Sequence, residues 1–148
     1  MAQASVLSET DVRRVFRIIE TTRYAERNRL VFVLSIYAGL RVGEIAALTT
    51  GDAVNQHGEA RREIKLEAHQ TKGTKGRTVI LSTRVRKEIE TFSKQRPTHS
   101  FDAPLIQSQR NRRAFSTVTL SMLFKEIYEL AGAFGRRPIP AGGRSPLG

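Results

Sequence analysis

The residues with the clearest chemical potential lie where a helix-forming stretch ends. Segment 37–48 reads YAGLRVGEIAAL and places Arg41 two residues after Gly39, with Glu44 three residues further on. A guanidinium presents a planar fork of donors that matches two phosphate oxygens, and it stays charged at any relevant pH. Glu44 lies one helical turn away and could orient that guanidinium. Taken alone, the two residues fit an ordinary ion pair at a helix start better than a phosphate site.

A second group of cations follows about thirty residues later. Segment 71–77, TKGTKGR, carries Lys72, Lys75 and Arg77 around two glycines. The order differs from the G-x-x-x-x-G-K-[ST] of a P-loop, so the sequence does not predict nucleotide binding there. A lone lysine in such a turn is usually only solvated. Together with Arg41, however, these cations favour phosphate binding.

The charge distribution points to a polyanionic partner. The net charge is +11; residues 1–74 contribute +2 and residues 75–148 contribute +9. Lysine and arginine side chains that dock on phosphates release condensed counterions, so this excess favours nucleic acid over a merely solvated basic surface. The chain has no cysteine, and its three histidines lack metal-ligand spacing, so we expect no cofactor and no metal.

The remaining pattern predicts a mostly helical α+β domain that contains a small antiparallel sheet. Apolar residues at helical spacing predict helices, with N-caps at Ser8 and at Ser82 or Thr83. Alternation of apolar and polar residues predicts strands. Segment 104–106 is expected to be the apolar anchor of a loop. The first predicted helix begins at Ser8. Further helices are predicted over 25–38, over 42–48, over a stretch that ends before Pro97, and over 117–131. The predicted strands are 63–67 and 77–81. In the last helix we expect Leu120, Leu123, Phe124, Ile127 and Leu130 to face inward.

Membrane and export signals are not evident. No run reaches the roughly 18–20 apolar residues of a membrane span, and the N-terminus lacks the pattern of a signal peptide. A cytoplasmic protein with no membrane partner is therefore expected. Segment 133–148 is rich in Gly, Pro and Arg without periodicity, so we predict an irregular or disordered tail after a domain that covers 5–132.

Segments 37–48 and 65–81 together resemble two signatures of the tyrosine recombinase, or phage integrase, family. The first resembles the box in which an arginine faces the scissile phosphate and an acidic residue follows three positions later. The second resembles the β-hairpin that carries a catalytic lysine. A weaker likeness extends from 104 through the last predicted helix. The resemblance implies site-specific DNA recombination or integration on double-stranded DNA, with other recombinase protomers as further partners, in a bacterial or phage-encoded protein.

The resemblance also implies roles for individual residues. Arg41 and Lys72 would be catalytic, with Glu44 in support; Lys72 would protonate the departing 5′ oxygen while a tyrosine forms a 3′-phosphotyrosine bond. The residues expected to hold DNA backbone phosphates are Lys75, Arg77, Arg110, Arg112 and Arg113. The central expectation is that Arg41 and Lys72 converge on one phosphate pocket.

The sequence also departs from the family pattern. No His-x-x-Arg box and no tyrosine follow residue 132. The chain is therefore expected to hold the N-terminal portion of a catalytic domain, with its C-terminal part missing, and to bind DNA but be inactive alone. A premature stop, a reading-frame slip or deliberate trimming would each explain the tail. Two other functions stay open: a non-enzymatic basic DNA-binding or regulatory protein, and an inhibitor of a full-length recombinase.

Overall fold

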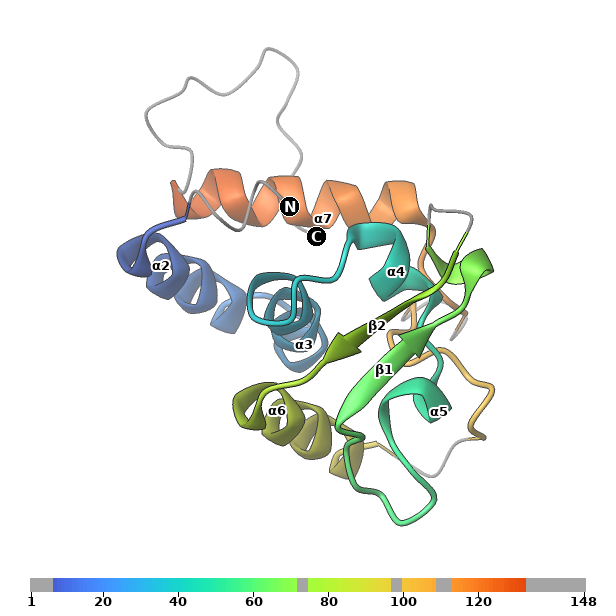
Figure 1. Cartoon of the computed structure of the whole chain (residues 1–148). Helices are drawn as coiled ribbons and strands as arrows, with labels where there is room; N and C mark the ends of the chain where they lie inside the picture. Colours follow the sequence, from blue (N-terminus) through green and yellow to red (C-terminus); the bar gives the residue numbers. More distant parts are fainter. Residues whose placement is uncertain (1–6, 72–74, 97–99, 109–112, 133–148) are drawn as a thin grey trace.

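The computed structural model describes residues 7–71, 75–96, 100–108 and 113–132. It confirms a mostly helical α+β fold with one small antiparallel sheet (Figure 1). In chain order the elements are α2 (Glu9–Glu20), α3 (Ala25–Ile36), α4 (Val42–Ala47), α5 (Thr50–Ala53), β1 (Glu63–Leu66), the 3-10 helix η1 (Ala68–Gln70), β2 (Arg77–Ile80), α6 (Thr83–Lys94) and α7 (Thr117–Ala131).

Serine side chains begin three of the long helices. Ser8 accepts a hydrogen bond from the Asp11 amide, and the Asp11 carboxylate accepts one from the Ser8 amide, which completes a capping box on α2. Ser82 caps α6 and Ser116 caps α7 in the same position. These caps satisfy amides that would otherwise lack partners at the helix start, so the local sequence determines where each helix begins.

Helix α3 forms the centre of the core. Leu30, Val31, Phe32, Val33 and Leu34 are all buried. A run of five buried residues covers more than one face of a helix, so α3 must be enclosed on several sides. Helices α2, α4 and α6 all contact α3, and the ring of Phe124 from α7 lies 4.4 Å from that of Phe32. In Figure 1, α3 accordingly lies in the middle of the helical part.

The two strands form a hairpin with one buried face. They pair antiparallel, with Glu63 opposite Ile80 and Leu66 opposite Arg77. Ile64 and Val79 face each other and are buried, whereas Ile80 is 72% exposed. This alternation follows from the two-residue period of a strand. Figure 1 shows one end of the hairpin beside α4 and the other beside α6.

Three details differ from the sequence-based expectations. Leu130 was expected to face inward but is 56% exposed, because the buried side of α7 is set by Leu120, Phe124, Ile127 and Ala131. Successive helical residues are about 100° apart, so Leu130 points well away from Ala131. The short helices α5 and η1 were not expected.

Helix α7 ends at Ala131, and Gly132 follows with a left-handed φ of 70°. Glycine adopts this conformation without the steric cost of a side chain, which explains a helix end at this position. The predicted tail, 133–148, lies outside the described residues. None of the described helices has the length and apolar content needed to cross a membrane.

Candidate phosphate-binding site

Arg41 stands at the turn between α3 and α4. It is the extended N-cap residue of α4, and its side chain is 57% exposed. Gly39 precedes it with a φ of 74°, and a Cβ built on Gly39 would meet nothing within 4 Å. The glycine is therefore favoured there by backbone conformation and not by lack of space. The turn lets the chain leave α3, bury Leu40 and present Arg41 to solvent.

Glu44 lies at the centre of the polar contacts behind Arg41. Its carboxylate is only 1% exposed and accepts the Arg41 amide at 2.9 Å, while the Arg41 guanidinium lies 3.8 Å away. The hydroxyl of Thr71 donates to Glu44 Oε2 at 2.6 Å. Arg77 donates through Nε to Oε2 at 2.9 Å and through Nη2 to Oε1 at 2.7 Å. The carboxylate thus joins the start of α4 to both ends of segment 71–77.

These contacts keep Glu44 ionised. Burial by itself raises the pKa of a carboxyl group because it penalises the charged form. Here the hydrogen bonds from Arg77, the Arg41 amide and Thr71, together with the positive charge of Arg77, outweigh burial and lower the pKa of Glu44 to about 2. The hydrogen bond with Glu44 in turn raises the pKa of Arg77. The pair is fully charged at neutral pH.

A hollow of about 450 Å³ opens in front of this cluster. It lies between the start of α4, η1 and the first turns of α7, and a Cβ built on Gly43 would come within van der Waals distance of Thr117. Its lining residues are Arg41, Val42, Gly43, Glu44, His69, Gln70, Thr71, Thr117 and Ser121. Hydroxyls and a guanidinium on one concave surface can hold a phosphate group by charge-assisted and neutral hydrogen bonds.

Gln70 lines this hollow and was not singled out from the sequence. It is buried, and its amide nitrogen donates to the Ala47 carbonyl and to Asp52, while its oxygen accepts the Glu67 amide. Gln70 therefore ties η1 to the segment after α4. A glutamine in a polar stretch carries no sequence signal for such a role. His69, which is exposed on η1, also lines the hollow.

The other predicted site residues are only partly described. Lys72, Arg110 and Arg112 lie outside the described residues, so the expected convergence of Arg41 and Lys72 stays a prediction. Lys75 is exposed on the hairpin, and Arg113 is exposed shortly before α7. Arg77, expected to hold a backbone phosphate, is engaged with Glu44 and remains 38% exposed.

None of the chain's three tyrosines, all of which are described, lines the hollow with Arg41. Tyr24 caps α3. Tyr37 stacks on Phe16, with the guanidinium of Arg84 4.5 Å from its ring centre. Tyr128 is buried, and burial raises its pKa to about 12 although a hydrogen bond with Ser35 acts in the opposite direction. The described lining of the hollow therefore offers a guanidinium and hydroxyls that could bind a phosphate, and no tyrosine hydroxyl.

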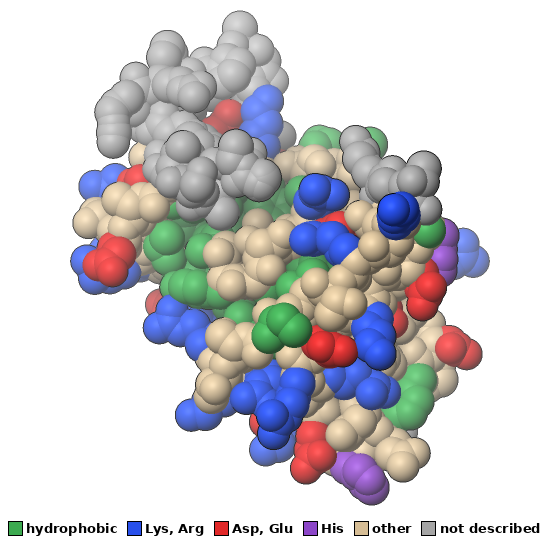
Figure 2. All heavy atoms as spheres, viewed as in Figure 1, with side chains coloured by type: hydrophobic (Ala, Val, Ile, Leu, Met, Phe, Trp, Pro, Cys, Tyr) green, Lys and Arg blue, Asp and Glu red, His purple; other side chains and the backbone are tan. Residues whose placement is uncertain are grey.

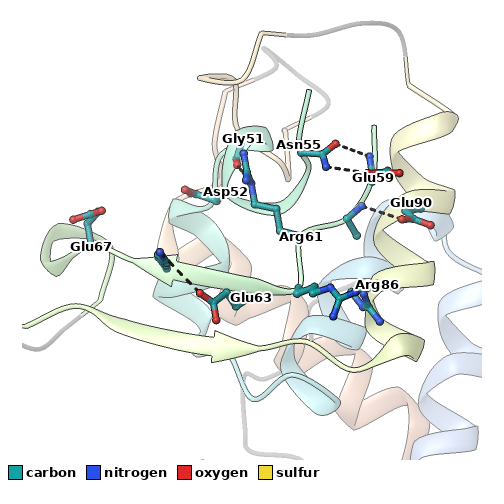
Figure 3. Close-up of a pocket in the computed structure, with 12 residues that line it drawn as sticks. Gly51, Asp52, Asn55, Glu59, Arg61, Glu63, Glu67, Arg86 and Glu90 are labelled. Carbon is teal, nitrogen blue, oxygen red and sulfur yellow. Dashed lines mark hydrogen bonds and ion pairs between the residues drawn. The ribbon is translucent and has the colours of Figure 1, made fainter. Parts of the chain in front are cut away.

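A second and larger hollow, of about 720 Å³, lies beside α5, β1 and α6 (Figure 3). Carboxylates and cationic side chains both line it. Arg61 donates to the Gly51 carbonyl, and Glu90 accepts the Ala60 amide. The face of the molecule in Figure 2 likewise mixes Lys and Arg with Asp and Glu. Among the described residues, no group of three His, Cys, Asp or Glu side chains could hold a metal ion.

Comparisons with known proteins agree with the resemblance drawn from the sequence. The model of the phage integrase family matches residues 5–140. One similar solved structure is the crystal structure of XerA recombinase, with a TM-score of 0.66 and 25% sequence identity. The match covers 86% of this chain and 42% of that chain, so this chain spans less than half of the XerA chain. A search of curated proteins found no match.

Proposed function

This chain belongs to the phage integrase family of tyrosine recombinases, and from that membership we propose that it binds double-stranded DNA with Arg41 on a backbone phosphate. The observation that carries the proposal is the geometry of Arg41. Its guanidinium is exposed at the rim of a concave site, while the buried carboxylate of Glu44 holds its backbone. A guanidinium that is partly free and backed by a fixed anion is suited to bind a phosphate.

Other cations would extend the contact along the DNA backbone. Lys75 lies on the same hairpin as Arg77, and Arg113 leads into the helix whose Thr117 and Ser121 line the hollow. Lys75, Arg110, Arg112 and Arg113 are proposed as phosphate contacts, and Lys72 as the acid that protonates a departing 5′ oxygen. Such contacts position DNA without reading its sequence.

We further propose that the chain forms no covalent bond to DNA by itself. Strand cleavage in this family needs a tyrosine at the scissile phosphate, but no described tyrosine lines the hollow, and the Tyr128 hydroxyl is buried. Incubation with a suicide DNA substrate should therefore yield no covalent protein–DNA adduct. An adduct that survives denaturing electrophoresis would overturn this part of the proposal.

The DNA-binding proposal is tested by fluorescence anisotropy on a labelled duplex at several salt concentrations. Arg41→Ala should weaken binding about tenfold and lower the salt slope by about one, because it removes one phosphate contact. The matched control is Arg14→Ala, which removes another half-exposed arginine, one that lies near Asp11 on α2. Equal effects of the two substitutions would refute the assignment of Arg41 and favour a diffuse basic surface.

A further inference from the structure

Arg77 contacts both sides of the turn that carries Arg41. Its Nη2 donates to the carbonyl of Gly39, two residues before Arg41, at 3.2 Å. The same guanidinium donates twice to Glu44, three residues after Arg41. One side chain from the hairpin therefore holds the entry to the turn and the first turn of α4 at the same time.

Arg41 has few contacts of its own that could fix its direction. Its amide donates to Glu44, and its guanidinium lies 3.8 Å from the same carboxylate and is otherwise mostly exposed. The direction of such a side chain depends on the backbone that bears it. That backbone is set by Gly39 and Glu44, and Arg77 bonds to both.

The position of Arg77 is itself well defined. It pairs with the buried Leu66 at the end of the hairpin. Gly76, immediately before it, packs so closely that a Cβ there would collide with the Leu66 carbonyl. The backbone that carries the Arg77 guanidinium is therefore fixed by the pairing of β2 with β1.

We propose that Arg77 is a positioning residue, which aims Arg41 by holding Gly39 and Glu44, and that it is not itself the phosphate contact expected from the sequence. The inference rests on the proposed function of Arg41 in binding DNA phosphate. It gives the ion pair between β2 and α4 a specific role, because this pair fixes the turn that carries the Arg41 guanidinium relative to β2.

A double-mutant cycle on duplex DNA affinity tests the proposal, with wild type, Arg41→Ala, Arg77→Ala and the double variant. If Arg77 acts through Arg41, each single substitution weakens binding several-fold, and the double variant binds no more weakly than Arg41→Ala alone. If Arg77 binds phosphate directly, the two losses multiply, and the proposal is overturned. Lys65→Ala is the matched control, because Lys65 is an exposed cation on the partner strand whose ion pair is with Glu63.

Arg77→Lys separates position from charge and serves where Arg77→Ala does not fold. Lysine keeps the charge but lacks the fork that reaches Gly39 and both oxygens of Glu44. Under the proposal it binds DNA as weakly as Arg77→Ala; affinity equal to that of wild type contradicts the proposal. Glu44→Gln adds a second test: freeing Arg77 should tighten binding if Arg77 contacts phosphate, and should weaken it if Arg77 only positions Arg41.

A readout without DNA keeps the inference separate from the proposed function. The Arg41 amide, bonded to Glu44, should exchange slowly with solvent in wild type and Lys65→Ala and much faster in Arg77→Lys, as followed by NMR. Unchanged protection in Arg77→Lys would overturn the positioning role. If Arg41→Ala leaves DNA affinity unchanged, the DNA-binding function fails, while this exchange measurement still decides whether Arg77 holds the turn.

Discussion

The two hollows described above both contain carboxylate and guanidinium groups, but they arrange these groups differently. In the larger one, shown in Figure 3, several carboxylates and several cations lie around an open space, and Arg61 and Glu90 bond to backbone groups. In the smaller one, a single buried carboxylate, Glu44, gathers its donors on one side and leaves the Arg41 guanidinium facing out. Several carboxylates disfavour an anion in the larger space, so the arrangement of charge, and not the volume, is the reason for which we propose the smaller hollow as the phosphate site.

The largest expected difference between the two regions concerns stability. Glu44→Ala removes a carboxylate that is 1% exposed and leaves Arg77 and Thr71 without their acceptor. Arg77 is 38% exposed, so water can partly replace the lost carboxylate, and the loss of these charge-assisted hydrogen bonds should cost about 2–3 kcal/mol in the free energy of unfolding. Glu90→Ala, which removes one half-buried acceptor of the Ala60 amide, should cost only about 1 kcal/mol. Urea denaturation measures the free energy of unfolding of both variants. Equal losses would show that Glu44 contributes no more to stability than Glu90 does.

The same carboxylate predicts a dependence of stability on pH. The pKa of Glu44 is about 2 in the folded protein, below its ordinary value of 4.5. A group with a depressed pKa stabilises the fold above its unfolded-state pKa and loses that contribution as the pH falls toward the folded value. The contribution should amount to roughly 3 kcal/mol.

Free energies of unfolding measured between about pH 6 and pH 3 would test this prediction against Glu44→Gln as a control. The wild-type protein should lose more stability than the variant across this range, because the variant has no carboxyl group to protonate at position 44. Parallel curves for the two proteins would show that Glu44 is not strongly stabilised in its ionised form.

A smaller difference is expected in DNA affinity. Arg61 lies in the larger hollow, and its Nε is bonded to the Gly51 carbonyl. We expect Arg61→Ala to change duplex affinity by no more than about twofold, against about tenfold for Arg41→Ala, because only the latter removes a phosphate contact. Anisotropy titrations at one salt concentration suffice. A loss with Arg61→Ala as large as that with Arg41→Ala would extend the DNA surface across the larger hollow.

The smallest effect is expected for Lys65→Ala. Lys65 is 75% exposed and lies 3.9 Å from Glu63, so solvent screens the pair. Its removal should change the free energy of unfolding by less than about 0.5 kcal/mol. Thermal denaturation measures the shift. A loss of stability as large as that of Glu44→Ala would contradict this prediction and would show that the exposed ion pair of Lys65 with Glu63 stabilises the hairpin.

Local chemistry made much of the fold predictable from the sequence. Serine caps such as Ser8 and the alternation around Ile64 and Val79 act within a few residues, so their spacing shows where helices and strands lie. The turn at Gly39 and the proximity of Arg41 to Glu44 were predictable for the same reason. Short elements such as α5 carry too few residues to show a period.

The partners of Glu44 were less predictable, because they come from distant parts of the chain. Arg77 is 33 residues away and Thr71 is 27 residues away. An arginine after a Lys-Gly turn has the same sequence signal whether it faces solvent or a buried carboxylate. Gln70 and Thr117 likewise become part of the site only when η1 and α7 pack against α4.

The close packing of Gly76 on the Leu66 carbonyl has a consequence for protein engineering. Thr71 is anchored to Glu44 at the other end of the same turn, so the stem of the hairpin tolerates little change. Insertions intended to alter the reach of the lysine-bearing turn, or libraries that vary its composition, should therefore be confined to positions 72–75. A graft of this hairpin onto another scaffold would need the glycine and a carboxylate counterpart to come with it.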